Sequence, residues 1–230
     1  MDKGINTLVF DLDDTLYSKA DIFFQTFKKH GHTSLTSHEL YQLYSHHSDI
    51  AFELFSSGDI TLQESHIKRV QDTFQTLQQP LSLEKVQEFL TDYHYFLNHV
   101  TLSDKWQQTL DALQKKGYTL ALLTNGPSQH QRNKIKSLQL EKWFSKKHWF
   151  ISEELGIAKP NPKVFEQVRI ALQKQQQECV MIGDSLTNDI IPAQQAGWHT
   201  IYYQEFNPSA AMTTISTQTA HSPLEILKMF

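Results

Sequence analysis

Residues 7–17 of the chain read Thr7-Leu8-Val9-Phe10-Asp11-Leu12-Asp13-Asp14-Thr15-Leu16-Tyr17, and the fold can be argued from them. A short run of β-branched and aromatic residues ends abruptly in carboxylates, which is typical of a buried parallel strand that delivers acidic groups to the carboxyl edge of a sheet. Open α/β sheets bind their ligands at that edge. We therefore expect the chemistry of this chain to lie at the end of its first strand.

Asp11 and Asp13 are two residues apart, so both can approach one small volume if Asp13 is the first residue beyond the strand. Crowded carboxylates repel each other, and they persist where a cation neutralises them or where one keeps a proton. Both conditions fit metal-assisted group transfer, with one Asp as nucleophile and the other as proton donor. A strand that simply ends in solvated acids is the alternative at this point.

Length and composition limit the classes of protein that this chain can be. Its 230 residues can form one large domain or two small ones. A net charge of -4 argues against binding to nucleic-acid polymers, which needs a clustered basic face. The single cysteine, Cys179, excludes an intramolecular disulfide, and its apolar neighbours predict a buried core residue. No apolar run approaches about 18 residues, and none resembles a signal peptide, so we expect a cytoplasmic protein without membrane contact.

Residues 18–99 are expected to form an all-helical segment inserted after the first strand. Two stretches match the capping-box pattern, in which a hydroxyl and a carboxylate satisfy the free amides of a helix start: Thr36-Ser37-His38-Glu39 and Thr61-Leu62-Gln63-Glu64. Apolar residues after the second box recur at spacings of three and four, which predicts amphipathic helices. We therefore expect a cap domain of roughly four helices at 18–99, with hinges near residues 17–20 and 100–104.

From residue 103 onward the pattern alternates between helix and strand. Apolar runs at 118–123, 149–151, 179–182 and 200–203 predict further strands, and the segments between them predict helices. Residues 208–222 are rich in Ser and Thr and are expected to form a loop before a short C-terminal helix. The alternation predicts an α/β fold. Its core, residues 1–17 and 100–230, is a Rossmann-like parallel sheet with right-handed crossovers and helices on both faces.

Polar groups follow the later strands as well. Thr124 offers a hydroxyl, and Asn125 and Gly126 offer backbone amides just before a helix. This combination suits a phosphate or oxyanion, although it is also ordinary turn chemistry. Lys159 is a lone cation beside a Pro-rich turn, where a solvated surface lysine is the alternative.

Asp184 and Asp189 are five residues apart where the strand at 179–182 gives way to a helix. One carboxylate can then reach a cation directly while the other braces the loop or binds through water, and a purely structural turn is the alternative. Together the strand ends supply a nucleophile, an acid, phosphate donors, a positive charge and a hard-cation site. Pro192 lies close inside the following helix, where its missing N–H is expected to loosen the first turn.

Four motifs resemble those of the haloacid dehalogenase superfamily in their order and spacing. They are Asp11-Leu12-Asp13-Asp14-Thr15-Leu16, Leu123-Thr124-Asn125, Lys159-Pro160, and Gly183-Asp184-Ser185 through Asp189. The helical segment after the first motif resembles the cap that this family inserts between its first strand and the rest of its core. The form Asp-Asp-Thr-Leu-Tyr is similar to helical-cap phosphatases of the pyrimidine 5'-nucleotidase type, which hydrolyse nucleoside monophosphates and other small phosphometabolites.

The resemblance implies a role for each acidic residue. Asp11 becomes the nucleophile that forms an aspartyl-phosphate, and it also binds Mg²⁺. Asp13 becomes the acid that protonates the leaving alcohol and the base that activates water, and its backbone carbonyl becomes a second metal ligand. Asp184 completes the protein ligands to the metal, and Asp189 ligates it through water or orients the loop.

The resemblance also implies that Thr124 and Asn125 hold the transferring phosphoryl group and that Lys159 offsets the charge around nucleophile and phosphate. These roles agree with general chemistry, because phosphoryl transfer needs in-line positioning and neutralisation of the phosphoryl oxygens. The dehalogenase branch of the family expels a halide and characteristically lacks an Asp at the position of Asp13. The presence of Asp13 therefore favours a phosphatase.

Two other functions stay open at this point. A mutase that passes phosphate between sugar hydroxyls would share the core residues, and a catalytically idle binding or regulatory module would keep the fold without turnover. The expected substrate is a small phosphorylated metabolite over which the cap closes, and monomer and homodimer are both open. Six side chains of the expected cap either stack a base or sugar or are mostly bundle core plus solvated histidines: Tyr41, Tyr44, His46, His47, Phe52 and Phe55.

Overall fold

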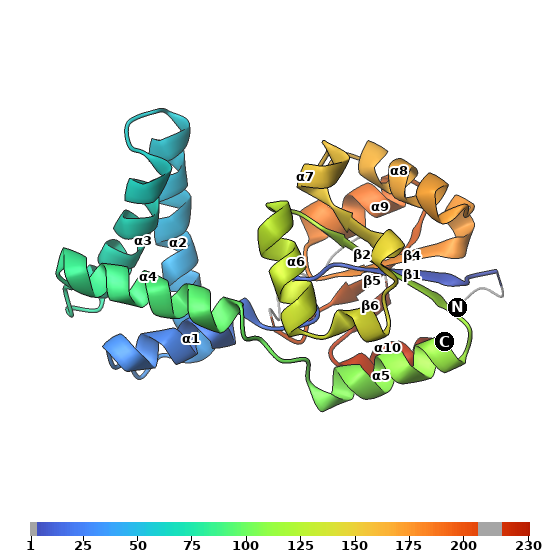
Figure 1. Cartoon of the computed structure of the whole chain (residues 1–230), viewed down its shortest axis with the longest axis horizontal. Helices are drawn as coiled ribbons and strands as arrows, with labels where there is room; N and C mark the ends of the chain where they lie inside the picture. Colours follow the sequence, from blue (N-terminus) through green and yellow to red (C-terminus); the bar gives the residue numbers. More distant parts are fainter. Residues whose placement is uncertain (1–3, 207–217) are drawn as a thin grey trace. The chain divides into compact units, whose positions relative to one another are not determined.

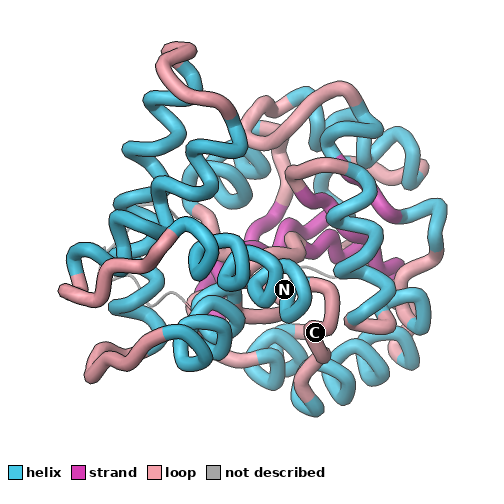
Figure 2. The backbone as a smooth tube through the Cα atoms, turned by 60° about the vertical axis from the view of Figure 1, so that its left-hand side comes forward, coloured by secondary structure: helices cyan, strands magenta, loops and turns pink. Residues whose placement is uncertain are grey.

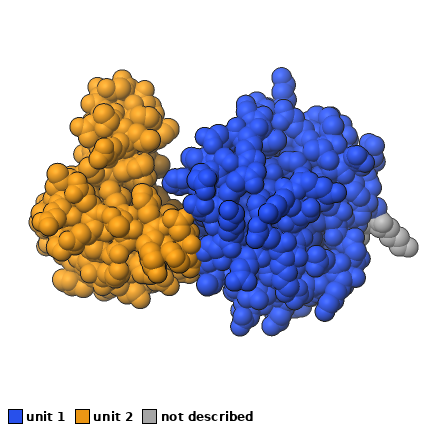
Figure 3. All heavy atoms as spheres, in the orientation of Figure 1, with its two compact units in different colours: residues 1–18, 100–230 blue, residues 19–99 orange. Residues whose placement is uncertain are grey.

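The computed structural model describes residues 4–206 and 218–230 and divides into two compact units. Unit 1 comprises residues 1–18 and 100–230, and unit 2 comprises residues 19–99 (Figure 3). The strands, magenta in Figure 2, all belong to unit 1. Among the described residues, no helix combines the length and the apolar character that a membrane crossing requires.

A six-stranded sheet forms the centre of unit 1. The order across the sheet is β3-β2-β1-β4-β5-β6, and every neighbouring pair is parallel. This confirms the predicted Rossmann-like sheet, and the strand order reverses between β1 and β4, where ligands of such sheets bind beyond the carboxyl ends of the strands. The strands are β1 (Thr7–Phe10), β2 (Thr119–Thr124), β3 (Trp149–Ile151), β4 (Cys179–Gly183), β5 (His199–Tyr203) and β6 (Gln218–Ala220).

Helices cover both faces of the sheet, with α8 and α9 on one side and α5 and α10 on the other (Figure 1). Successive strand residues point to opposite faces. Val9 belongs to a core cluster with Phe165 of α8 and the buried Cys179, as predicted for that cysteine. Phe10 instead meets Trp106 of α5 edge-to-face at 5.8 Å between ring centroids. The helices of unit 1 are α5 (Asp104–Lys115), α6 (Ser128–Ser137), α7 (Ser152–Leu155), α8 (Lys163–Leu172), α9 (Ile191–Gln195) and α10 (Pro223–Met229), and short 3-10 turns occupy Leu140–Lys142, Lys146–His148 and Gln176–Glu178.

The expected loop at 208–222 is wrong in its last part. Gln218–Ala220 forms β6, which pairs in parallel with β5 from Ile201↔Gln218 to Tyr203↔Ala220. This strand has three residues, and two of them are exposed, so it carries no apolar run that would reveal it. Residues 208–217 lie outside the described residues.

The segment after β4 also differs from the single helix expected there. A π-helical turn, η4 (Leu186–Ile190), comes first, with the N–H of Ile190 donating to the carbonyl of Ser185 at 3.1 Å. The α-helix α9 begins only at Ile191. Pro192 is therefore in the first turn of α9, where a missing N–H leaves no bond unmade, and the wide turn lies before it.

Unit 2 contains the four predicted helices: α1 (Lys19–His30), α2 (Ser37–Ser56), α3 (Leu62–Thr76) and α4 (Leu83–Leu97). Both predicted capping boxes are present, at the starts of α2 and α3. The unit has its own aromatic core, in which Phe23 stacks on Tyr44 and Phe27 stacks on Phe74. Of the six aromatic and histidine side chains considered above, Tyr44 is thus core, whereas Phe52 is 62% exposed.

Candidate active site

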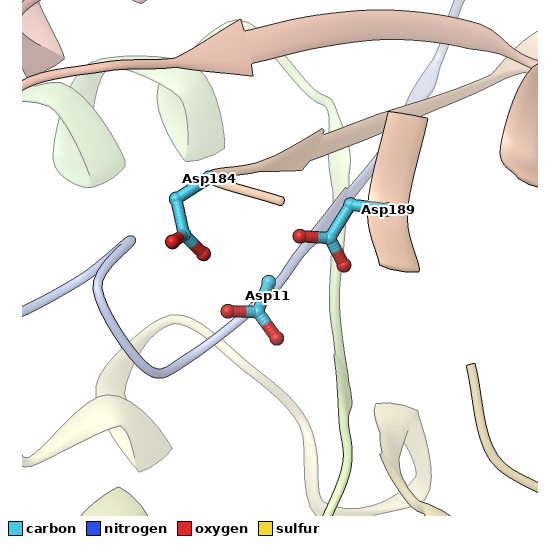
Figure 4. A group of neighbouring side chains, drawn as sticks. All are labelled: Asp11, Asp184 and Asp189. Carbon is cyan, nitrogen blue, oxygen red and sulfur yellow. The ribbon is translucent and has the colours of Figure 1, made fainter. Parts of the chain in front are cut away.

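Three carboxylates meet at the carboxyl edge of the sheet. Asp11 directly follows β1, and its N–H donates to the carbonyl of Ile182 in β4 at 2.9 Å. Asp184 directly follows β4, and Asp189 lies in η4. Figure 4 shows their carboxyl groups gathered together, and one oxygen of each lies within 4.8 Å of the others. In the described ranges this is the only group of three or more acidic, His or Cys side chains that could hold one metal ion.

Lys159 joins two of these carboxylates from the loop before α8. Its Nζ lies 2.6 Å from Oδ1 of Asp11 and 2.6 Å from Oδ1 of Asp189, and its side chain is 3% exposed. When all three carboxylates are ionised, their negative charge exceeds the charge of Lys159 by two, which one divalent cation would neutralise. Since hard cations such as Mg²⁺ bind carboxylate oxygens, the donor set fits Mg²⁺.

The charges at this site perturb one another strongly. Burial raises the pKa of Asp11 to about 7, Lys159 opposes the rise, and Asp189 and Asp13 add to it. Burial also acts to lower the pKa of Lys159, but the charges of Asp11 and Asp189 outweigh burial and raise that pKa. Lys159 therefore stays charged, while Asp11 holds a proton more readily than an ordinary Asp. A bound cation would favour the ionised form of Asp11.

Asp189 also braces the loop in which it lies. Its Oδ2 accepts the N–H of Ser185 at 3.0 Å, and its side chain is 1% exposed. The glycine at the end of β4, Gly183, makes room for it, since a Cβ there would lie 2.7 Å from Cβ of Asp189 and closer still to its carboxylate. Both roles considered for Asp189, loop bracing and a place near the cation, are compatible with this position.

Asp13 lies outside the carboxylate cluster. Its Oδ1 accepts from Lys134 Nζ at 2.7 Å and from the hydroxyl of Tyr17, and its Oδ2 accepts from Gln131 Nε2 at 3.0 Å. The carboxyl group therefore faces α6, which carries Gln131 and Lys134. This position suits a proton donor beside the metal site better than a side-chain metal ligand.

The side chains of Thr124 and Asn125 have different hydrogen-bond partners. The Thr124 hydroxyl accepts from Gln131 Nε2 at 2.5 Å, so its own proton can be donated to a ligand. The side chain of Asn125 is engaged by the protein, because its Nδ2 donates to the carbonyl of Lys159 at 2.8 Å and its Oδ1 accepts the N–H of Lys159 at 3.0 Å. The N–H of Gly126, expected as a phosphate donor, instead donates to Ser152 Oγ at 3.0 Å.

The match to a family of known proteins agrees with this geometry. The family model described as haloacid dehalogenase-like hydrolase matches residues 5–197 of the chain. This chain belongs to the haloacid dehalogenase-like hydrolase family. The range includes all four carboxylates, Thr124 and Lys159.

Relatives of this haloacid dehalogenase-like hydrolase differ in how much of the chain they match. A glyceraldehyde 3-phosphate phosphatase from Pyrococcus furiosus is 35% identical over 98 residues, which is 43% of this chain and 40% of the relative, so the chain spans less than half of that protein. The pyrophosphatase PpaX from Anoxybacillus flavithermus is 27% identical over 202 residues, 86% of this chain and 82% of the relative. The crystal structure of the putative HAD-hydrolase YfnB from Bacillus subtilis, bound to magnesium, has a TM-score of 0.71 at 24% identity and covers 99% of both chains. That likeness shows the fold.

Sequence reasoning missed three contacts of Asp13 in this haloacid dehalogenase-like hydrolase: Tyr17, Gln131 and Lys134. One signal was available for Gln131. The helix α6 is polar, and its buried residues are Gln131 and Ile135, which are four apart and so share one face. A glutamine at the inner face of a helix needs buried partners.

Proposed function

We propose that this chain is a Mg²⁺-dependent phosphatase that hydrolyses a small phosphorylated metabolite through an aspartyl-phosphate on Asp11. The observation that carries the proposal is the convergence of Asp11, Asp184 and Asp189 on one volume, with Lys159 bonded to two of them. With all three carboxylates ionised, a divalent cation would balance the negative charge that Lys159 leaves, and a phosphoryl group brings further negative charge that cation and lysine together offset.

In the first step, a carboxylate oxygen of Asp11 attacks phosphorus while Asp13 gives its proton to the leaving alcohol oxygen. Lys159 and the hydroxyl of Thr15, which donates to Asp11 Oδ2 at 3.3 Å, hold the nucleophile. In the second step, Asp13 takes a proton from water, and the water oxygen attacks phosphorus to release phosphate and restore Asp11. Mg²⁺ held by Asp11, Asp184 and Asp189 would supply charge neutralisation for the phosphoryl oxygens.

Two further observations support phosphate ester hydrolysis over halide displacement. Asp13 provides the proton that an alcohol leaving group needs and that a halide does not. The relatives named above are called a glyceraldehyde 3-phosphate phosphatase and a pyrophosphatase, and both names describe hydrolysis at phosphorus. We further propose that unit 2, residues 19–99, serves as the cap that selects the substrate.

The test is phosphate release from a panel that includes nucleoside monophosphates, glyceraldehyde 3-phosphate, pyrophosphate and p-nitrophenyl phosphate, with Mg²⁺ and with a chelator. The variant Asp11→Asn is compared with Asp14→Asn, a neighbouring acid at φ 59°, a conformation that Asn also tolerates. We expect turnover in the wild type and in Asp14→Asn, and none in Asp11→Asn or with chelator. Turnover that survives Asp11→Asn would refute the mechanism.

Product analysis separates the remaining alternatives. Free phosphate from a hexose phosphate supports the phosphatase, whereas an isomeric hexose phosphate identifies a mutase. Absence of any Asp11-dependent turnover across the panel favours the idle module.

A further inference from the structure

Gln131 is an unusual residue for its position. It lies on the inner face of α6 and is 1% exposed. The other residue of that helix that is buried, Ile135, is apolar. Burying a carboxamide is unfavourable unless its hydrogen-bonding groups find partners. Gln131 finds them in residues that the proposed reaction uses.

The amide nitrogen of Gln131 serves three acceptors. Nε2 lies 2.5 Å from Thr124 Oγ1, 2.8 Å from the Asn125 carbonyl and 3.0 Å from Asp13 Oδ2. The backbone carbonyl of Asn125 can only accept, so the nitrogen of the carboxamide and not its oxygen must face it. Two amide hydrogens are therefore shared among three acceptors that come from two strand ends.

These bonds determine how two reactive groups are presented. Because the Thr124 hydroxyl accepts from Gln131, its proton is left for a different acceptor, as a phosphoryl oxygen would be. The same amide holds one oxygen of Asp13, while Lys134 and Tyr17 contact the other. Gly126 lets Gln131 come this close, since a Cβ at that residue would lie 3.2 Å from Cδ of Gln131.

We propose that Gln131 is a positioning residue of this phosphatase, which turns the Thr124 hydroxyl toward the phosphoryl group and holds the Asp13 carboxyl in place for transfer of its proton to the leaving group. The proposal rests on the proposed function. It assigns no contact between Gln131 and the substrate. Its effect is exerted through Asp13 and Thr124.

The reaction offers a readout that distinguishes this role from simple helix packing. A nitrophenolate leaving group departs with little help from a proton donor, whereas an alkoxide needs one. Loss of Asp13 positioning should therefore lower kcat more on an alkyl phosphate than on p-nitrophenyl phosphate. Loss of structure alone would lower both equally.

The experiment compares Gln131→Met, which keeps the length and removes the donor, with Gln129→Met on the exposed side of the same helix. Both are assayed on p-nitrophenyl phosphate and on an alkyl phosphate that the wild type hydrolyses, and melting is recorded for each. We expect Gln131→Met to lower kcat about 100-fold on the alkyl phosphate and about tenfold on the aryl phosphate, because small misplacement of reacting groups has effects of this size. Gln129→Met should match the wild type.

A second variant covers the case in which Gln131→Met does not fold. Gln131→Glu keeps the shape but places an acceptor against Asp13, so we expect a still larger loss of kcat on the alkyl phosphate. Wild-type kcat in either variant, or equal losses on the two substrates, would overturn the proposal. Failure of the proposed function looks different, because the wild type would then be inactive or Asp11→Asn would stay active.

Discussion

At the scale of single residues, Lys159 decides whether the carboxylates can stay together. Its ammonium lies 2.6 Å from oxygens of both Asp11 and Asp189 and is almost fully shielded from water. Removing one partner from a buried ion pair is strongly destabilising because the other charge is left uncompensated. Lys159 is therefore expected to matter both for stability and for turnover.

Replacing Lys159 with Met tests this directly. We expect the free energy of unfolding of the metal-free protein to fall by about 3 kcal/mol or more, and kcat on the best panel substrate to fall at least about 100-fold. Chemical denaturation and steady-state assays measure the two effects. Lys163→Met, an exposed lysine at the start of α8, is the matched control. Equal unfolding free energies and equal kcat values in the two variants would show that Lys159 contributes no more than an exposed lysine.

The sequence predicts which charged residues gather at the site, but it does not predict which partners the carboxamide side chains bind. Asp11 and Asp184 directly follow β1 and β4, so the parallel sheet alone predicts that they approach one edge. Lys159 lies beyond α7 in the loop before α8, so only the resemblance of its motif predicts that it joins them. The phosphate contact expected of Asn125 stays a prediction, and the structure adds two contacts of its side chain with the backbone of Lys159. An amide can donate and accept, so only the packed structure decides which neighbours it takes.

At the scale of elements, the end of β4 shapes the site. Gly183 ends the strand where Asp189 returns from η4, and no side chain fits between them. We expect Gly183→Ala to displace Asp189, which Lys159 and the N–H of Ser185 otherwise hold. Overpacking of this kind destabilises by about 1–3 kcal/mol, and displacement of the carboxylate should lower kcat about 100-fold.

The control for that variant is Gly4→Ala, because a Cβ at Gly4 would meet no atom within 4 Å. Activity measured as a function of Mg²⁺ concentration separates an effect on kcat from an effect on the affinity for Mg²⁺. We expect Gly183→Ala, and not Gly4→Ala, to need a higher Mg²⁺ concentration for half-maximal activity. If kcat and the Mg²⁺ concentration for half-maximal activity are both unchanged, the added methyl group is accommodated without displacing the Asp189 carboxylate.

Elements with a strong apolar pattern were predictable, and weakly patterned ones were not. The helices at both capping boxes and the five apolar strands lie where periodicity indicated. The exposed strand β6 and the π-helical turn η4 lack such a pattern, since one is held by pairing with β5 and the other by a bond from Ile190 to Ser185. Both depend on partners that the local sequence does not reveal.

At the scale of the whole molecule, metal binding and protonation compete for one site. The pKa of Asp11 is about 7 in the folded protein against an ordinary value of 3.8, so folding favours its protonated form. The corresponding stabilisation is complete below about pH 4 and is lost as the pH rises through about 7. Mg²⁺ binds the ionised carboxylate, so its stabilising effect should grow over the same interval.

We therefore expect Mg²⁺ to raise the melting temperature by several degrees at about pH 8 and by much less at about pH 5, since ligand at 100 times its Kd contributes about 2.7 kcal/mol. Differential scanning fluorimetry with and without chelator gives the shift. In Asp184→Asn we expect Mg²⁺ to leave the melting temperature unchanged at both pH values. A shift that is the same at both pH values, or that survives in Asp184→Asn, would place the metal elsewhere.

Chemical trapping of the phosphorylated enzyme tests whether Asp11 is the nucleophile. An acyl phosphate that survives an acid quench is reduced by borohydride, which converts the aspartyl side chain to homoserine, and mass spectrometry locates the changed residue. We expect homoserine at position 11 in wild-type enzyme quenched during turnover with Mg²⁺, and no such change without substrate or in Asp11→Asn. An enzyme that turns over rapidly yet carries the modification at another carboxylate would show that Asp11 is not the nucleophile.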